Sequence, residues 1–147
     1  MKQILVATDG SENSRYALDE AVELAAAAGA KLTVVYVRHA PLPILGEPVY
    51  QRSLSAEIGH ADETIAIAIG VAHTAGVEAE GEVLEGDPAK RIAELARLRD
   101  VDLIVVGSRG LGPFAGTLLG SVSHDVLHHA DRPVLVAARR AARRRAA

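Results

Sequence analysis

The stretch VDLIVVGSRGLGPFAGTLLGSVS, residues 101–123, carries the clearest indication of the fold class of this chain. Its first part, Val101–Val106, is almost entirely apolar, which predicts a buried strand. A glycine-rich loop follows from Gly107 to Ser123, and Ser121–Ala130 is predicted to be helical. A buried strand that leads through a loop into a helix is the repeating unit of an α/β protein with a parallel sheet.

Short apolar runs alternate with helical patterns along the rest of the chain as well. This order predicts a five-stranded parallel sheet with right-handed crossovers and helices on both faces. We see no internal repeat or linker, so we expect one domain over residues 1–138. The other strands are predicted at Lys2–Thr8, Lys31–Val37, Val77–Leu84 and Pro133–Ala138, and the other helices near 12–28, 54–72 and 88–99.

Several helix boundaries are marked by specific residues. Ser11 is a good N-cap for the first helix, because a serine side chain accepts a hydrogen bond from a backbone N–H of the first turn. Asp87 does the same for the third helix, and Pro88 suits its first position. Gly29 is expected to end the first helix, since glycine readily adopts the left-handed conformation of a C-terminal cap.

Two segments differ from this regular pattern. The strand Val77–Leu84 carries Glu78, Glu80 and Glu82 on one face, so we expect a charged edge strand and not a catalytic carboxylate pair. Residues 39–52 contain three prolines and a glycine. We expect an irregular loop there, which is long for a compact domain and is either a functional lid or a tolerated insertion.

The composition limits the chemistry and the compartment. Hydrophobic residues make up 49% of the chain but aromatic residues only 3%, so the core must consist of aliphatic side chains. There is no cysteine, which excludes disulfides, thiolate catalysis and cysteine-ligated zinc and fits a reducing compartment. The start, MKQILVATDG, has too few consecutive apolar residues for a signal peptide or a membrane span. We therefore expect a cytoplasmic protein without a membrane segment.

Charge is distributed unevenly along the chain. The net charge is −3, yet five arginines lie in residues 139–147, and without them the chain would carry −8. An acidic body argues against a nucleic-acid-binding fold. The basic tail, 139–147, leaves two alternatives open: contact with RNA, DNA or an acidic partner, or a solvated terminus.

The ends of two strands are the best place for a ligand. In open α/β sheets the ligand lies beyond the carboxyl ends of the strands, where the strand order reverses. The first strand ends at Thr8, Asp9 and Gly10, and the fourth ends at Gly107. With the order 3-2-1-4-5 these two strands are neighbours, and Asp9 lies beside the glycine-rich loop.

The loop itself has the chemistry of an anion site. Glycines allow backbone N–H groups to approach a phosphate closely, and Gly120-Ser121 opens a helix whose free N–H groups carry a partial positive charge. The hydroxyls of Ser121 and Ser123 are further donors, and Arg109 is the one cation between Gly107 and His124. A Walker motif is absent because no lysine precedes Ser121.

The spacing Gly107-x2-Gly110-x9-Gly120-Ser121 resembles the ATP-binding branch of the universal stress protein family. The resemblance extends over nearly the whole chain, through ILVATDGS at the start, Gly86-Asp87-Pro88, DLIVVGSRG and LLGSVSHDVLHHADRPVLV. It implies a flavodoxin-like sandwich with strand order 3-2-1-4-5, usually a homodimer. It also implies ATP as the ligand, with Mg²⁺ or Mn²⁺ among the phosphates.

The resemblance further implies roles for individual residues. The adenosine end is expected at Thr8, Asp9 and Val37. No residue is assigned as a direct metal ligand. The phosphates are expected at the loop and helix positions Gly107, Arg109, Gly110, Gly120, Ser121, Val122 and Ser123.

The sequence is compatible with several classes of function. The leading hypothesis is a nucleotide-dependent sensor or regulator in stress response. The alternatives are a slow ATPase, a structural dimer without nucleotide, and a binder of AMP or a cyclic nucleotide. The bare apolar strand 134–138 predicts a two-fold dimer formed through that edge. His124, His128 and His129 could suggest a metal, but a third ligand is not evident, so we expect an ordinary helix face.

Overall fold

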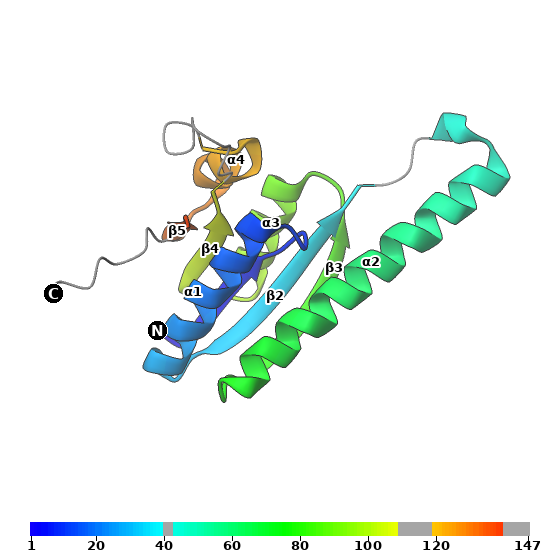
Figure 1. Cartoon of the computed structure of the whole chain (residues 1–147). Helices are drawn as coiled ribbons and strands as arrows, with labels where there is room; N and C mark the ends of the chain where they lie inside the picture. The colour runs from blue at the N-terminus through cyan, green and yellow to red at the C-terminus, as the bar shows by residue number, and fades with distance from the viewer. Residues whose placement is uncertain (40–42, 109–118, 140–147) are drawn as a thin grey trace, which may run out of the picture.

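A computed structural model describes residues 1–39, 43–108 and 119–139. Five strands form one parallel sheet in the order β3-β2-β1-β4-β5 (Figure 1). This confirms the predicted sheet and its strand order. The strands are β1 (Gln3–Ala7), β2 (Lys31–Arg38), β3 (Ala79–Glu85), β4 (Leu103–Gly107) and β5 (Val134–Ala137).

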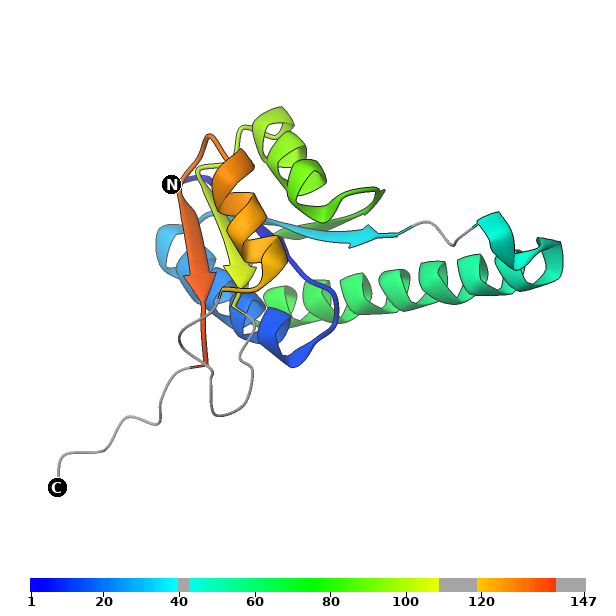
Figure 2. The ribbon, with the colours of Figure 1, turned by 90° about the horizontal axis from the view of Figure 1, so that it is seen from above.

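Helices cover both faces of the sheet, as expected (Figure 2). Alternate residues of β1 point to opposite faces: Ile4 packs into the core under α1 and α2, and Leu5 into the core under α3 and α4. Both side chains are completely buried, and burying one such side chain contributes about 1.5–3 kcal/mol. The helices are α1 (Glu12–Ala28), α2 (Glu47–Thr74), α3 (Pro88–Leu98) and α4 (Ser121–His129).

The predicted helix caps are present. The Ser11 side chain accepts a hydrogen bond from the backbone N–H of Ser14 at 3.3 Å, and Asp87 accepts one from Lys90 at 3.0 Å. Gly29 ends α1 in the left-handed conformation, with φ of 66°. These contacts satisfy backbone groups that a helix end otherwise leaves without partners.

Residues 43–52 are not the irregular loop that the prolines of 39–52 predict, and residues 40–42 lie outside the described part of the chain. Pro43–Leu45 forms a short 3-10 helix, and α2 begins at Glu47, well before the expected start near residue 54. Pro48 lies in the first turn of α2, where the missing N–H of proline costs no helical hydrogen bond. The amino-terminal part of α2 therefore projects past the edge of the sheet (Figures 1 and 2). Although α2 has 28 residues, none of the described helices is long and apolar enough to cross a membrane.

Strand β3 is a charged edge, as predicted, although it begins at Ala79. Arg99 pairs with Glu80 at 2.9 Å and also with Glu82. Such exposed pairs contribute little stability, about 0.2–1 kcal/mol each. Their main effect is to cover the outer strand with charge, which discourages pairing with another sheet edge.

Strand β4 begins two residues later than its apolar run suggests. The Asp102 carboxylate accepts hydrogen bonds from the backbone N–H groups of Lys2 at 2.6 Å and Gln3 at 2.9 Å. Asp102 therefore joins β4 to the start of β1 through its side chain, and regular strand pairing starts at Leu103.

Candidate functional site

The strand order reverses at the carboxyl ends of β1 and β4. From β1 the chain crosses through α1 to β2 on one side, whereas β4 pairs with β1 on the other side. Parallel strands that diverge in this way leave a crevice beyond their carboxyl ends. At this carboxyl end of the sheet lie three segments: the residues that follow β1, the end of β4 at Gly107, and the start of α4 (Figure 2). The structure thus brings together the segments that the sequence assigns to the two ends of a ligand.

Gly107 is required by packing. A Cβ at this position would lie 2.5 Å from the carbonyl oxygen of Asn13, in the first turn of α1. The Gly107 carbonyl accepts a 2.5 Å hydrogen bond from the hydroxyl of Ser123. The end of β4 is therefore held between the amino-terminal turns of α1 and α4.

Among the residues that the structure describes, no side chain caps the first turn of α4. Its N-cap is Gly120, and no described side chain accepts a hydrogen bond there, in contrast to the capped starts of α1 and α3. The N–H groups of Ser121, Val122 and Ser123 have no partners within the helix. They carry the partial positive charge of the helix dipole, which favours an anion. Ser121 is exposed and Ser123 is buried, so the two hydroxyls have different surroundings.

Hydrogen bonds of the backbone and of side chains fix the turn after β1. The backbone N–H of Thr8 donates to the Val35 carbonyl at 2.9 Å, and the Thr8 hydroxyl lies 3.1 Å from that of Ser14. The Asp9 carboxylate accepts a hydrogen bond from the backbone N–H of Ser11 at 2.9 Å. These contacts fix the position of Asp9 beside the crevice.

The Asp9 carboxyl is held in its charged form. Partial burial acts to raise its pKa, but hydrogen bonds from Ser11 and Ser14 outweigh this effect, and the pKa lies below the ordinary value. Asp9 is therefore an acceptor for hydroxyl or amine donors at neutral pH. A group with a lowered pKa is a poor general base.

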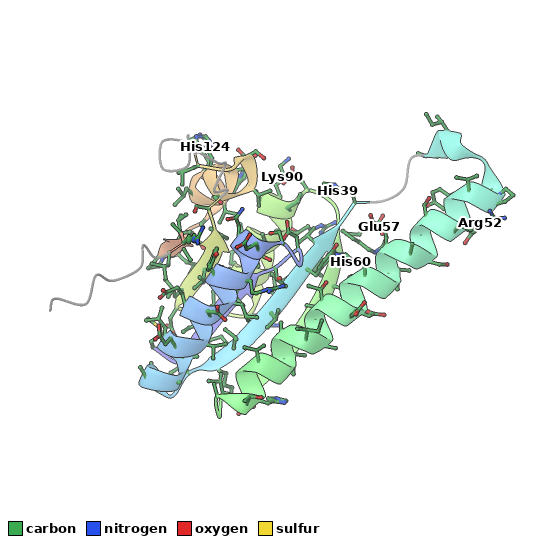
Figure 3. The ribbon with its side chains drawn as sticks, in the orientation of Figure 1. His39, Arg52, Glu57, His60, Lys90 and His124 are labelled. Carbon is green, nitrogen blue, oxygen red and sulfur yellow. The ribbon has the colours of Figure 1, made fainter. Side chains whose placement is uncertain are left out.

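The helix α2 contributes residues that the sequence pattern did not reveal. The His60 ring nitrogen Nε2 lies 3.4 Å from the Asp9 carbonyl oxygen, and the His60 ring meets the ring of Tyr36 edge to face at 5.8 Å. In Figure 3, Glu57 and His60 lie where α2 passes the end of β2, and Arg52 lies farther out on the projecting part. Helical periodicity places His60 on α2, but only the packing of α2 against β2 brings it to Asp9.

The structure describes some of the remaining predicted residues but not others. Val37 lies near the end of β2, half-buried against the core under α3 and α4. Arg109 and Gly110 lie outside the described residues. The rings of His124 and His128 are 5.5 Å apart, and among the described residues no group of three metal-binding side chains occurs.

The sequence profile described as the universal stress protein family matches residues 1–138. The chain belongs to this family. A universal stress protein of Thermus aquaticus is 39% identical over 137 residues, which cover 92% of this chain and 97% of the relative.

Two solved structures of universal stress proteins that hold nucleotides are also similar to this chain. One, in complex with cAMP, is 32% identical with a TM-score of 0.71 and covers 92% of this chain and 95% of its own. The other, from Archaeoglobus fulgidus in complex with dAMP, is 27% identical with a TM-score of 0.69 and covers 93% and 98%. Members of the family with this fold therefore bind adenine nucleotides.

Proposed function

We propose that this universal stress protein binds an adenine nucleotide, with ATP as its ligand, and acts as a nucleotide-dependent sensor or regulator in stress response. The observation that carries the proposal is the uncapped first turn of α4 at the edge where the strand order reverses. An uncapped helix start at this place suits a phosphate group. The cAMP and dAMP complexes of similar family members support the adenine nucleotide.

The phosphate end is assigned to α4 and to the loop before it. Backbone N–H groups of Ser121, Val122 and Ser123 donate to phosphate oxygens, and the exposed Ser121 hydroxyl adds a donor. Gly120 has no side chain, so a phosphate can approach this turn closely. Gly107, Arg109 and Gly110 complete the assigned set, with Mg²⁺ or Mn²⁺ held by the phosphates.

The adenosine end is assigned to the turn after β1 and the end of β2. The Asp9 carboxylate is charged and already fixed by Ser11, which suits an acceptor for ribose hydroxyls. Thr8 positions this turn through Ser14. Val37 contributes an apolar surface and its backbone for the adenine ring.

A sensor fits this site better than an enzyme. Asp9 is the carboxylate assigned to this site, and its lowered pKa makes it a weak general base. The loop contains no lysine, and Arg109 is its one arginine, so little charge is available to stabilise phosphoryl transfer. We expect ATP hydrolysis slower than about one turnover per minute, far below the usual enzyme median of about 10 per second.

Assembly and compartment are further parts of the proposal. The edge position of β5, together with its apolar sequence VLVA, supports a homodimer formed by residues 134–138 of two copies. The cysteine-free composition fits a cytoplasmic protein. Nucleic acid is not assigned as a partner of the acidic body.

Mass spectrometry of nucleotide released from purified, denatured protein tests the proposed ligand. We expect ATP, in an amount that approaches one per chain. Recovery of only AMP or a cyclic nucleotide would replace ATP while leaving the site intact. Absence of nucleotide, together with no heat of binding when ATP is titrated into the protein, would contradict the proposal and favour a structural dimer.

A further inference from the structure

A surface groove runs beside the outer face of α1, on the side where β5 ends. Three carboxylate residues of α1, Asp19, Glu20 and Glu23, line it together with the apolar residues Val22 and Ala26. The helix has no basic residue in its last turn, where the negative end of its dipole lies. The groove is therefore suited to a cationic segment with short apolar side chains.

The chain itself leads into this groove. β5 packs against α1, and Ala138 and Arg139, which follow β5, line the groove together with α1. Arg139 is close enough to Tyr16 for its charge to oppose the rise in the Tyr16 pKa, which the hydrogen bond to Glu12 mainly causes. The carboxyl-terminal segment therefore starts at the groove, next to the amino-terminal part of α1.

The composition of that segment complements the groove. Residues 139–147 read RRAARRRAA, five arginines and four alanines, with no acidic residue. Eight residues follow Arg139, and an extended chain of this length spans about 26–29 Å. The distance along α1 from Tyr16 to Glu23 is only about 10 Å at the helical rise of about 1.5 Å per residue. The segment can thus reach each of the three carboxylates in the groove.

We propose that residues 139–147 dock in the α1 groove of their own protomer, with their arginines paired to Asp19, Glu20 and Glu23. Each exposed pair is weak, but a tethered segment binds at an effective concentration near the millimolar range, above that of a second molecule in dilute solution. In the docked state the arginines of the segment contact the acidic body of the protein. This inference does not depend on the proposed nucleotide site.

Paramagnetic relaxation enhancement in the full-length protein tests this docking. The chain contains no cysteine, so Ala147→Cys provides a single attachment point for a nitroxide label. We expect broadening of the backbone amide signals of α1 near Asp19 and Glu23, with the amides of α3 unaffected. The broadening should decrease strongly when the ionic strength is raised to about 1 M, where the Debye length is about 3 Å.

Charge variants separate specific docking from nonspecific attraction. Asp19→Asn with Glu23→Gln should abolish the broadening, whereas Asp62→Asn with Glu63→Gln, an equal change of charge on exposed positions of α2, should leave it unchanged. The tail variant Arg143→Gln with Arg144→Gln and Arg145→Gln should also abolish it without altering α1.

Three results would overturn the proposal. One is the absence of broadening on α1 in the labelled protein. Another is broadening that survives both the α1 and the tail substitutions. The third is equal broadening in a mixture of isotope-labelled protein without nitroxide and nitroxide-labelled protein without isotope, since this would show contact between molecules.

Discussion

The hydroxyl of Ser123, in the first turn of α4, donates a 2.5 Å hydrogen bond to the carbonyl oxygen of Gly107, the last residue of β4. This bond ties the start of α4 to the sheet and orients the N–H groups of its first turn. Ser123 is buried, whereas Ser121, the first residue of the same turn, is exposed. The two serines in the first turn of α4 therefore have different surroundings in the structure.

We expect Ser123→Ala to lower the free energy of unfolding by about 1–3 kcal/mol, because the Gly107 carbonyl loses its buried donor. Ser121→Ala should change this free energy by less than about 0.5 kcal/mol, as an exposed substitution usually does. It should instead weaken ATP binding by about 1–2 kcal/mol, the loss of one hydroxyl bond to a charged group. Urea unfolding and calorimetric titration measure the two effects. Equal stability losses in both variants would contradict this division.

Gly107→Ala should destabilise the protein by about 1–3 kcal/mol, the usual cost of forcing extra atoms into a packed site. The reason is backbone crowding, since the new Cβ would lie 2.5 Å from the Asn13 carbonyl oxygen. Gly59→Ala in α2 is the matched control, because nothing lies within 4 Å of a Cβ there and alanine favours a helix by about 0.5–1 kcal/mol. Urea unfolding of both variants checks the prediction. A neutral Gly107→Ala would show that the close packing of α1 against β4 is unimportant.

Asp102 should make stability depend on pH in the acidic range. Hydrogen bonds from the backbone of Lys2 and Gln3 hold the pKa of the Asp102 carboxyl below its ordinary value of 3.8. A lowered pKa stabilises the fold above pH 3.8, and this contribution is lost as pH falls through the folded-state pKa. Asp102→Ala should therefore be less stable than the unsubstituted protein at pH 7, and the difference should shrink below pH 3.8. A difference that does not vary with pH would contradict this role.

Val136→Asp should convert a dimer into a monomer, because a charge would enter the edge that two copies of β5 share in the proposed assembly. Leu98→Asp is the matched control, since Leu98 is exposed on α3, away from β5. Sedimentation velocity at micromolar concentration measures the oligomeric state, and circular dichroism checks the fold. A monomeric unsubstituted protein, or a folded Val136→Asp variant that remains dimeric, would contradict assembly through β5.

The sequence predicted the parallel sheet well because its evidence is local. Apolar runs such as those around Leu5 and Ile104 mark buried strands, and Ser11 and Asp87 mark helix starts. The hydrophobic periodicity and the helix caps therefore predict the same strands and helices. The predicted start of α2 was wrong because a proline is compatible with the first turn of a helix as well as with a loop. The sequence around Pro48 does not distinguish these two settings.

The candidate site was predicted less completely because its contacts are long-range. The glycine spacing predicts a phosphate site around Gly107 and Gly120, which stays a prediction, and the strand order places the end of β1, before Asp9, beside the end of β4. The hydrogen bond of Ser123 and the approach of His60 to Asp9 both depend on how helices pack against the sheet. No pattern of neighbouring residues encodes such packing.

Two further variants separate the roles of the two ends of the proposed site. Gly120→Val places a branched side chain where phosphate would approach the N-terminus of α4, so it should abolish ATP binding. Asp9→Ala removes the acceptor assigned to adenosine, so it should weaken ATP binding while leaving competition by inorganic tripolyphosphate unchanged. Gly70→Ala, at an exposed position of α2 ten residues after His60 where nothing lies within 4 Å of an added Cβ, should bind ATP as the unsubstituted protein does.

Calorimetric titration of ATP with Mg²⁺ into the unsubstituted protein and the Gly120→Val variant tests nucleotide binding at α4 most directly. The protein is first freed of bound nucleotide, and circular dichroism confirms that both proteins are folded. We predict binding near the micromolar range, about −8 kcal/mol, for the unsubstituted protein and no measurable heat of binding for Gly120→Val. Equal affinity in the two proteins would contradict the assignment of the phosphates to the first turn of α4.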